Sequence, residues 1–155
     1  GGYEYYKFDK KARAQENGEF FVSAMADLKN NGQTITEEID NELISVLIKL
    51  NEAKYFEEKG DIKSASATYN DVISKYGENK FFNHYSKFQL YLMDPAKSLG
   101  DVKKIKILDE LSAPDSPLKL LALEQKLYLY VILYHHIYPS FVNVLIIYPI
   151  QLWHN

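Results

Sequence analysis

The chain has 155 residues, of which 18 are Lys or Arg and 21 are Asp or Glu, so its formal net charge is -3. At this length a chain can bury about 70% of the surface that it exposes when unfolded, and it needs no disulfide or metal to fold. The absence of Cys excludes disulfides, thiolate nucleophiles and Cys-based zinc sites. No stretch concentrates enough Lys and Arg to follow a phosphate backbone, so we expect no nucleic-acid partner.

The first predicted element is a long helix over residues 3–30, which contains no Pro and only Gly18 as an interruption. The pair Asn31-Gly32 ends it. An apolar face at helical spacing is formed by Phe20, Phe21, Ala24, Met25 and Leu28. Near the start, "FDKKARAQ" is a short basic cluster, which we interpret as a solvated helix face or as a contact for anionic lipid headgroups.

A second helix is predicted to open at "TITEEID", with Thr36 as its N-cap and acidic residues in its first turn, where the helix dipole favours negative charge. Gly60 is predicted to end it as a left-handed cap residue, and Asp61 to cap a third helix over residues 62–76. One face of this third helix is apolar and consists of Ile62, Ala65, Tyr69, Val72, Ile73 and Tyr76.

A fourth helix, "KFFNHYSKFQLYLM", is predicted to stop at Asp94-Pro95, because the residue before a proline avoids helical geometry. A fifth, "DVKKIKILDEL", follows Gly100. A sixth is predicted to have Ser116 as its N-cap and Pro117 at its first helical position. Strand signals are weak, so the sequence predicts an all-α fold in which short loops join antiparallel helical hairpins.

The second and third predicted helices resemble one tetratricopeptide repeat in their pattern of small, aromatic and glycine residues: Ala53, Phe56, Gly60, Ala65, Tyr69 and Val72. Lys49 and Glu52 depart from this pattern, since the family usually has a large apolar residue at these places, and Gly77 stands where a proline is common. The resemblance implies hairpins stacked as a short tetratricopeptide-like solenoid. An ordinary helical hairpin with the same local packing is the alternative.

The order of segments adds a second resemblance. A long first helix with an aromatic start, a repeat hairpin and the turn "LDELSAPDSPLKLLALE" resemble the tetratricopeptide-like family of bacterial membrane-tethered proteins that includes the ancillary subunit of the SecYEG translocon, particularly its alphaproteobacterial relatives. This resemblance implies a transmembrane segment upstream of Gly1 and a domain on the periplasmic side of the inner membrane. It also implies partners among translocon, chaperone and envelope-assembly proteins.

The family resemblance implies a non-catalytic protein–protein interaction scaffold, in which the first helix of each hairpin lines a groove for segments of a partner. The predicted partner-binding residues are Leu47, Leu50, Lys54, Glu57 and Glu58. We expect one domain over residues 1–155. It would consist of a long helix (1–32), repeat hairpins (33–126) and an atypical C-terminal hairpin (127–155).

The C-terminal segment carries no Asp, Glu, Lys or Arg after Lys126. Residues 127–155 are numerous enough to span a bilayer, although two prolines and polar residues interrupt them. Our main interpretation is a buried hairpin split at Pro139, or self-association into a dimer, because large exposed apolar surfaces usually mark interfaces. Membrane contact and an abnormal C-terminus are the alternatives.

An enzyme with a site around His84, or around the pair His135 and His136, is the rival class. Adjacent residues on a helix point about 100° apart, so this pair cannot bind one metal as an i, i+4 pair can. Acidic pairs such as Asp109-Glu110 are typical of solvated helix faces. We therefore predict no catalytic residue, no metal ligand and no cofactor.

Overall fold

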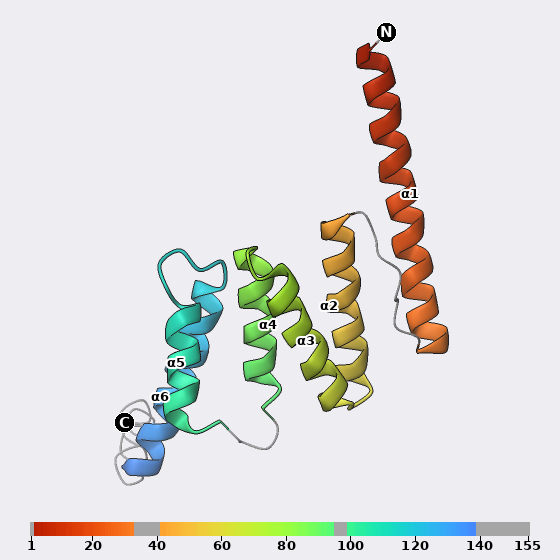
Figure 1. The fold of residues 1–155 in the computed structure, drawn as a ribbon. Helices are drawn as coiled ribbons and strands as arrows, with labels where there is room; N and C mark the ends of the chain where they lie inside the picture. Colours follow the sequence, from red (N-terminus) through yellow and green to blue (C-terminus); the bar gives the residue numbers. More distant parts are fainter. Residues whose placement is uncertain (1, 33–40, 95–98, 139–155) are drawn as a thin grey trace, which may run out of the picture. The chain divides into compact units, whose positions relative to one another are not determined.

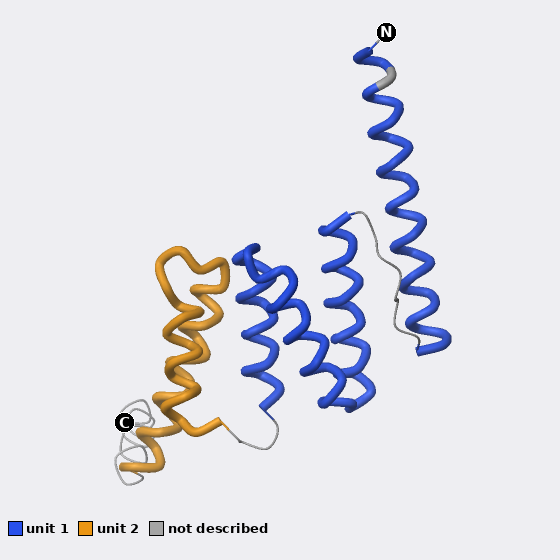
Figure 2. Tube along the Cα trace, viewed as in Figure 1, with its two compact units in different colours: residues 1–96 blue, residues 97–155 orange. Residues whose placement is uncertain are grey.

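The computed structural model of the protein describes residues 2–32, 41–94 and 99–138 (Figure 1). Regular structure in these ranges is entirely helical, which confirms the all-α class. The chain divides into two compact units, residues 1–96 and residues 97–155 (Figure 2). The helices are α1 (Gly2–Asn31), α2 (Glu42–Glu58), α3 (Ile62–Tyr76), α4 (Lys80–Leu92), α5 (Asp101–Leu111) and α6 (Lys119–Ile137).

The C-terminal part of α1 packs against α2, whereas the N-terminal part is exposed. The predicted apolar face makes the contact, with Ala24 and Leu28 buried and the three other members half-buried. The helix ends at Asn31, and Gly32 has a left-handed φ of 62°. Both the face and the end of this helix agree with the prediction.

The pair α1 and α2 differs from the predicted antiparallel arrangement. Its two helices run in the same direction (Figure 1), and a Cβ atom at Gly32 would lie 3.1 Å from the hydroxyl oxygen of Tyr55, close to the C-terminal end of α2. The geometry is possible because residues 32–41 can span up to about 33 Å, whereas α2 is about 25 Å long. Consecutive helices are expected to be antiparallel only where a short loop joins them.

The turn between α2 and α3 has the predicted residues in the predicted roles. Gly60 has a φ of 76°. Its N–H donates to the carbonyl oxygen of Glu57 at 3.0 Å, and the N–H of Asp61 donates to the carbonyl oxygen of Phe56 at 2.9 Å. These two bonds form a Schellman motif. The side chain of Asp61 then caps α3, because its Oδ1 accepts the N–H of Ser64 at 3.1 Å.

The tight turn brings α2 and α3 onto a common core with the end of α4. The buried members of this core are Ala53, Ala65, Tyr69 and Met93. Ala53 and Ala65 have no exposed surface, and their small side chains let the two helices approach closely. The predicted inner face of α3 is confirmed, since Ala65, Tyr69 and Val72 are fully buried.

Asparagine caps begin both α2 and α4. The Oδ1 atom of Asn41 accepts the N–H of Ile44 at 3.1 Å, and that of Asn79 accepts the N–H of Phe81 at 3.1 Å. These bonds satisfy backbone donors that a helix N-terminus leaves unpaired. Thr36, the predicted cap of the second helix, lies outside the described residues, and the described helix starts at Glu42.

Within residues 97–155, α5 packs against α6. Leu108 and Leu111 of α5 are fully buried, as is Ala122 of α6. An ion pair between Asp109 and Lys126 links the two helices, and the hydrogen bond to this carboxylate raises the pKa of Lys126. Leu108 and Leu111 therefore lie on the packed face of α5, whereas Val102, at the start of the helix, is 82% exposed.

The predicted start of the sixth helix is wrong by two residues. The hydroxyl oxygen of Ser116 accepts the N–H of Leu118 at 3.2 Å, but α6 begins at Lys119 and its N-cap residue is Leu118. Ser116 thus caps a turn that includes Pro117, and this turn separates it from the helix. A serine followed by proline favours both arrangements, so the local sequence alone does not decide between them.

The first arm of the predicted C-terminal hairpin belongs to α6, which is continuous from Lys119 to Ile137. The second arm lies in residues 139–155, outside the described part of the chain. Among the described helices, none combines the length and the apolar character needed to cross a bilayer.

Replacing Ser86 by Ala is expected to raise the free energy of unfolding by about 1 kcal/mol. Ser86 is fully buried in α4, and its hydroxyl has no hydrogen-bond partner among the described residues, so its desolvation is uncompensated. Urea unfolding followed by circular dichroism measures the effect. Ser23→Ala, at an exposed position of α1, controls for the helix propensity of Ala. A loss of stability in Ser86→Ala would contradict this account.

Candidate partner-binding site

A hollow of about 170 Å³ lies between α2 and α4 in residues 1–96. We call it the α2–α4 hollow, and its lining consists of Leu47, Leu50, Asn51, Lys54, Phe81, Phe82 and Tyr85. Small-molecule sites usually measure about 300–1,000 Å³. The α2–α4 hollow is therefore the size of one large side chain and too small for a typical cofactor.

The helix periodicity of α2 brings its four lining residues together. Leu47, Leu50, Asn51 and Lys54 are spaced by three, one and three residues, so they share one face of the helix. Leu50 also packs against the buried core, whereas Lys54 reaches solvent. This face therefore has an apolar floor that the core holds in place and a charged edge.

The α4 wall of the hollow is aromatic. The rings of Phe81 and Tyr85 are stacked with centroids 6.1 Å apart, and the rings of Phe81 and Phe82 meet edge to face at 5.6 Å. The side chain of Phe81 is half exposed (48%), although a phenyl ring gains by burial. The wall thus presents an aromatic surface to any group that enters the hollow.

A chain of polar contacts runs along the edge of the hollow. Lys54 Nζ donates to Glu57 Oε1 at 2.9 Å, and the hydroxyl of the buried Tyr69 lies 3.4 Å from Glu57 Oε2. The bond to Glu57 raises the pKa of Lys54. Burial, together with the nearby Tyr85 and Glu57, raises the pKa of the Tyr69 hydroxyl. Lys54 is therefore held as a cation and Tyr69 as a neutral phenol.

These protonation states suit binding. A nucleophilic lysine needs a lowered pKa, and a tyrosine that acts as a base must lose its proton near neutral pH. The ammonium group of Lys54 has three N–H donors, of which one goes to Glu57. It can therefore donate to a carboxylate or a carbonyl oxygen of a bound segment.

The predicted site residues divide into three groups. Leu47, Leu50 and Lys54 line the hollow, as expected for a groove-facing surface. Glu57 does not line it but holds Lys54 at its edge. Glu58 is exposed and is not part of the lining. Whether these residues bind a partner stays a prediction.

Four lining residues were not predicted as site residues, namely Asn51 and the three aromatic residues of α4. Asn51 follows Leu50 directly and shares the face of Leu47, to whose carbonyl oxygen its side-chain amide donates at 2.8 Å. The aromatic run "KFFNHY" after Asn79 was a usable signal, because two of its rings recur at i and i+4, as Phe81 and Tyr85. Only the packing of α4 beside α2 makes these rings part of the site.

A second hollow, of about 660 Å³, lies within residues 1–96 at the end of α3. It is lined by Glu42, Ser74, Lys75, Tyr76, Gly77 and Glu78. Most of these residues are exposed, and Lys75 forms an ion pair of 3.3 Å with Asp71 on the same helix. This hollow is wide and lacks the aromatic wall of the first.

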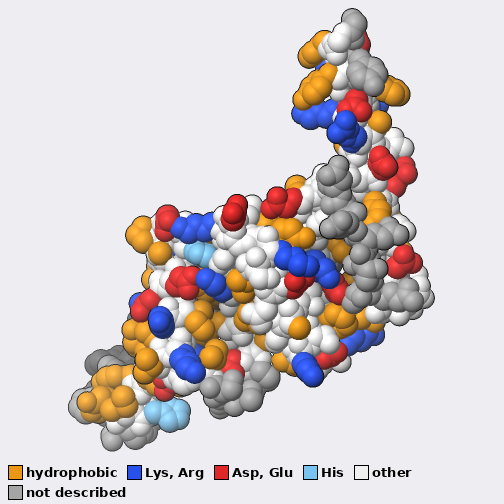
Figure 3. All heavy atoms as spheres, in the orientation of Figure 1, with side chains coloured by type: hydrophobic (Ala, Val, Ile, Leu, Met, Phe, Trp, Pro, Cys, Tyr) orange, Lys and Arg blue, Asp and Glu red, His pale blue; other side chains and the backbone are white. Residues whose placement is uncertain are grey.

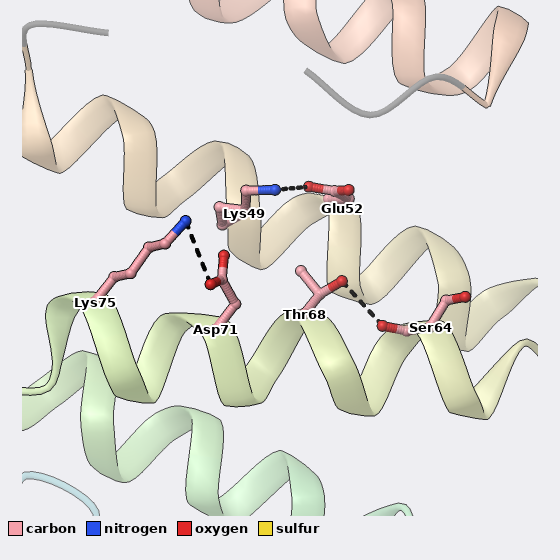
Figure 4. A network of polar contacts seen from close by, with 6 residues as sticks. All are labelled: Lys49, Glu52, Ser64, Thr68, Asp71 and Lys75. Carbon is pink, nitrogen blue, oxygen red and sulfur yellow. Dashed lines mark hydrogen bonds and ion pairs between the residues drawn. The ribbon is translucent and has the colours of Figure 1, made fainter. Parts of the chain in front are cut away.

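Two of the residues that depart from the repeat pattern, Lys49 and Glu52, form an ion pair. Lys49 Nζ lies 2.8 Å from Glu52 Oε2, and Glu52 is buried (4% exposed). Figure 4 shows this pair on α2 and the Asp71–Lys75 pair on the neighbouring α3, each within its own helix. The positively charged partner makes the burial of the Glu52 carboxylate possible.

The histidines on which the rival enzyme hypothesis depends lie on two different helices and differ in burial. His84 is buried in α4, whereas His135 and His136 are exposed on α6, and His136 Nδ1 lies 3.0 Å from the carbonyl oxygen of Ile132. Within the described ranges, no three His, Asp or Glu side chains are grouped so that they could hold a metal ion.

No family model, curated protein or solved structure matches this chain. Membership of the membrane-tethered tetratricopeptide-like family therefore stays a prediction from the sequence.

Proposed function

We propose that this chain is a non-catalytic interaction scaffold that binds a short segment of a partner protein in the α2–α4 hollow. The observation that carries the proposal is the hollow itself, which combines an apolar floor, an aromatic wall and a lysine that, among the described residues, donates only to Glu57. Its volume fits one large apolar side chain of a partner. Asn51 and Lys54 would hydrogen-bond to the backbone or to an acidic residue beside that anchor.

The tetratricopeptide-like interpretation accounts for the position of the hollow. In such a solenoid the first helices of successive hairpins line the concave face. We propose that α2 and α3 form one repeat and that α4 begins the next, which puts both walls of the hollow on first helices. By the family resemblance, the partner would be a translocon, chaperone or envelope-assembly protein on the periplasmic side of a bacterial inner membrane.

Selection of random peptides on the full-length chain tests the binding role. Enriched peptides are expected to share one large apolar residue. Phe81→Ser should weaken their binding about tenfold or more, because a central aromatic contact dominates such interfaces. Leu92→Ser is the matched control, since Leu92 lies on the same helix with a similar exposure (50%) and does not line the hollow. Equal losses in both variants, or no enriched peptide, would contradict the proposal.

Self-association through α6 is a second candidate function, favoured by one observation. Leu127, Val131, Tyr134 and Tyr138 are all exposed and follow the 4-3-4 spacing of a coiled-coil seam. Leu127→Glu should convert a dimer into a monomer in light scattering. Val102→Glu, at an exposed apolar position of α5, should leave the dimer intact. A monomeric wild-type chain would remove this candidate.

A further inference from the structure

The N-terminal part of α1, residues 2–19, is a helical arm without tertiary support among the described residues. Its described residues are exposed except Asp9 and Asn17, which are half-buried. The arm is about 27 Å long. In proteins most of the stability of a helix comes from packing of one face against another surface, which residues 2–19 lack among the described residues. The arm therefore presents a surface that another surface could cover and stabilise.

One face of this arm is both aromatic and basic. Tyr3, Tyr6, Lys7, Lys10 and Arg13 fall within an arc of about 120° on the helix. Lys7 lies over the ring of Tyr3 at 4.7 Å, and Lys10 over the ring of Tyr6 at 5.6 Å. Both rings are more than half exposed. We call this set the basic face of α1.

The acidic residues of the arm lie on the other side. Glu4, Asp9, Glu16 and Glu19 occupy the opposite arc of the helix. Arg13 Nη2 lies 3.0 Å from Asp9 Oδ2, at the border between the two sides. Figure 3 shows hydrophobic and Lys or Arg side chains together at the N-terminal part of α1. Lys11 lies between the two arcs, so the basic face carries most, but not all, of the positive charge of the arm.

We infer that the basic face of α1 binds an anionic lipid surface. Lys and Arg near such a surface are attracted to its headgroups, and Tyr rings are favoured at headgroup depth, where the ring is buried and the hydroxyl stays wet. With only two rings on this face, the contact is peripheral and sensitive to salt. The inference is independent of the α2–α4 hollow, because no residue is shared.

Co-sedimentation of the full-length chain with vesicles tests this inference. The readout is the excess of binding to vesicles of phosphatidylcholine and phosphatidylglycerol in equal parts over binding to phosphatidylcholine alone. Lys7→Gln/Lys10→Gln/Arg13→Gln should reduce this excess about 100-fold, since each charge contributes roughly fivefold. The control Lys63→Gln/Lys103→Gln/Lys106→Gln removes the same charge from other exposed positions and should reduce the excess much less.

Hydrogen exchange locates the contact in the same samples. Amides of residues 2–19 should be protected by the mixed vesicles and not by neutral ones. Because α6 is apolar and exposed, it could bind both kinds of vesicle, but it would not protect the arm. The inference is overturned by the absence of an excess, by equal loss in both triple variants, or by an arm that exchanges freely on anionic vesicles. The last result would leave an acidic protein as the occupant to test.

Discussion

Replacing Lys49 by Met is expected to lower the free energy of unfolding by about 3 kcal/mol. Glu52 is 4% exposed and lies 2.8 Å from Lys49 Nζ, so the substitution leaves a carboxylate buried without its counter-charge. Breaking a buried pair from one side usually costs about 3–5 kcal/mol. We expect the lower end of that range because the Lys49 side chain is 27% exposed and solvent reaches the pair. Urea unfolding followed by circular dichroism measures the loss.

Two further variants separate this effect from the loss of any ion pair. Lys54→Met removes a pair of the same spacing on the same helix, but its side chain is 50% exposed, so we expect a loss below about 1 kcal/mol. Lys49→Met/Glu52→Leu removes both charges and should recover most of the stability, because well-packed apolar residues replace a buried pair at little cost. If Lys49→Met and Lys54→Met had equal effects, the buried carboxylate would not be the cause.

The same pair shows what the repeat pattern could and could not predict. Lys49 and Glu52 were identified from sequence as departures, since tetratricopeptide repeats usually have large apolar residues at these places. Their spacing of three residues on a helix allowed an ion pair, but not the inference that Glu52 is buried. Burial depends on the packing around α2, which local sequence does not contain.

Turns were predictable where one residue has a special backbone requirement. Gly32 and Gly60 both have positive φ values, and both were identified as helix ends. Asp61 was identified as a cap because its side chain acts on a residue only three positions away. The Ser116 prediction was wrong since a serine before proline caps a turn as readily as a helix. The parallel arrangement of α1 and α2 depends on a long connection, and no residue in that connection indicates the direction in which α2 runs.

The candidate site was half predictable for a similar reason. Leu47, Leu50 and Lys54 share a helix face, and helical periodicity is enough to group them. Phe81 and Tyr85 belong to another helix, and their place in the hollow depends on where α4 lies relative to α2. Aromatic density in α4 indicated a packed or binding surface, but not which one.

Tyr69→Ala is expected to lower the free energy of unfolding by about 4 kcal/mol, the cost of a large cavity in a packed core. Tyr69 is fully buried in α3 at the centre of the core that α2, α3 and the end of α4 share. Tyr69→Phe keeps the ring and loses only the 3.4 Å contact with Glu57, so it should cost about 1 kcal/mol. Tyr3→Ala, at an exposed site, should stay within about 0.5 kcal/mol.

The Tyr69 variants also connect the core to the proposed site. Leu50 and Tyr85, which line the α2–α4 hollow, pack against the core that contains Tyr69. Tyr69→Ala should therefore weaken the binding of a selected peptide even under conditions in which the variant is folded, whereas Tyr69→Phe should bind it as the wild type does. Unchanged binding by a folded Tyr69→Ala would mean that the hollow does not depend on this core. Weaker binding by Tyr69→Phe would instead give the Tyr69 hydroxyl a direct part in holding Glu57 and Lys54.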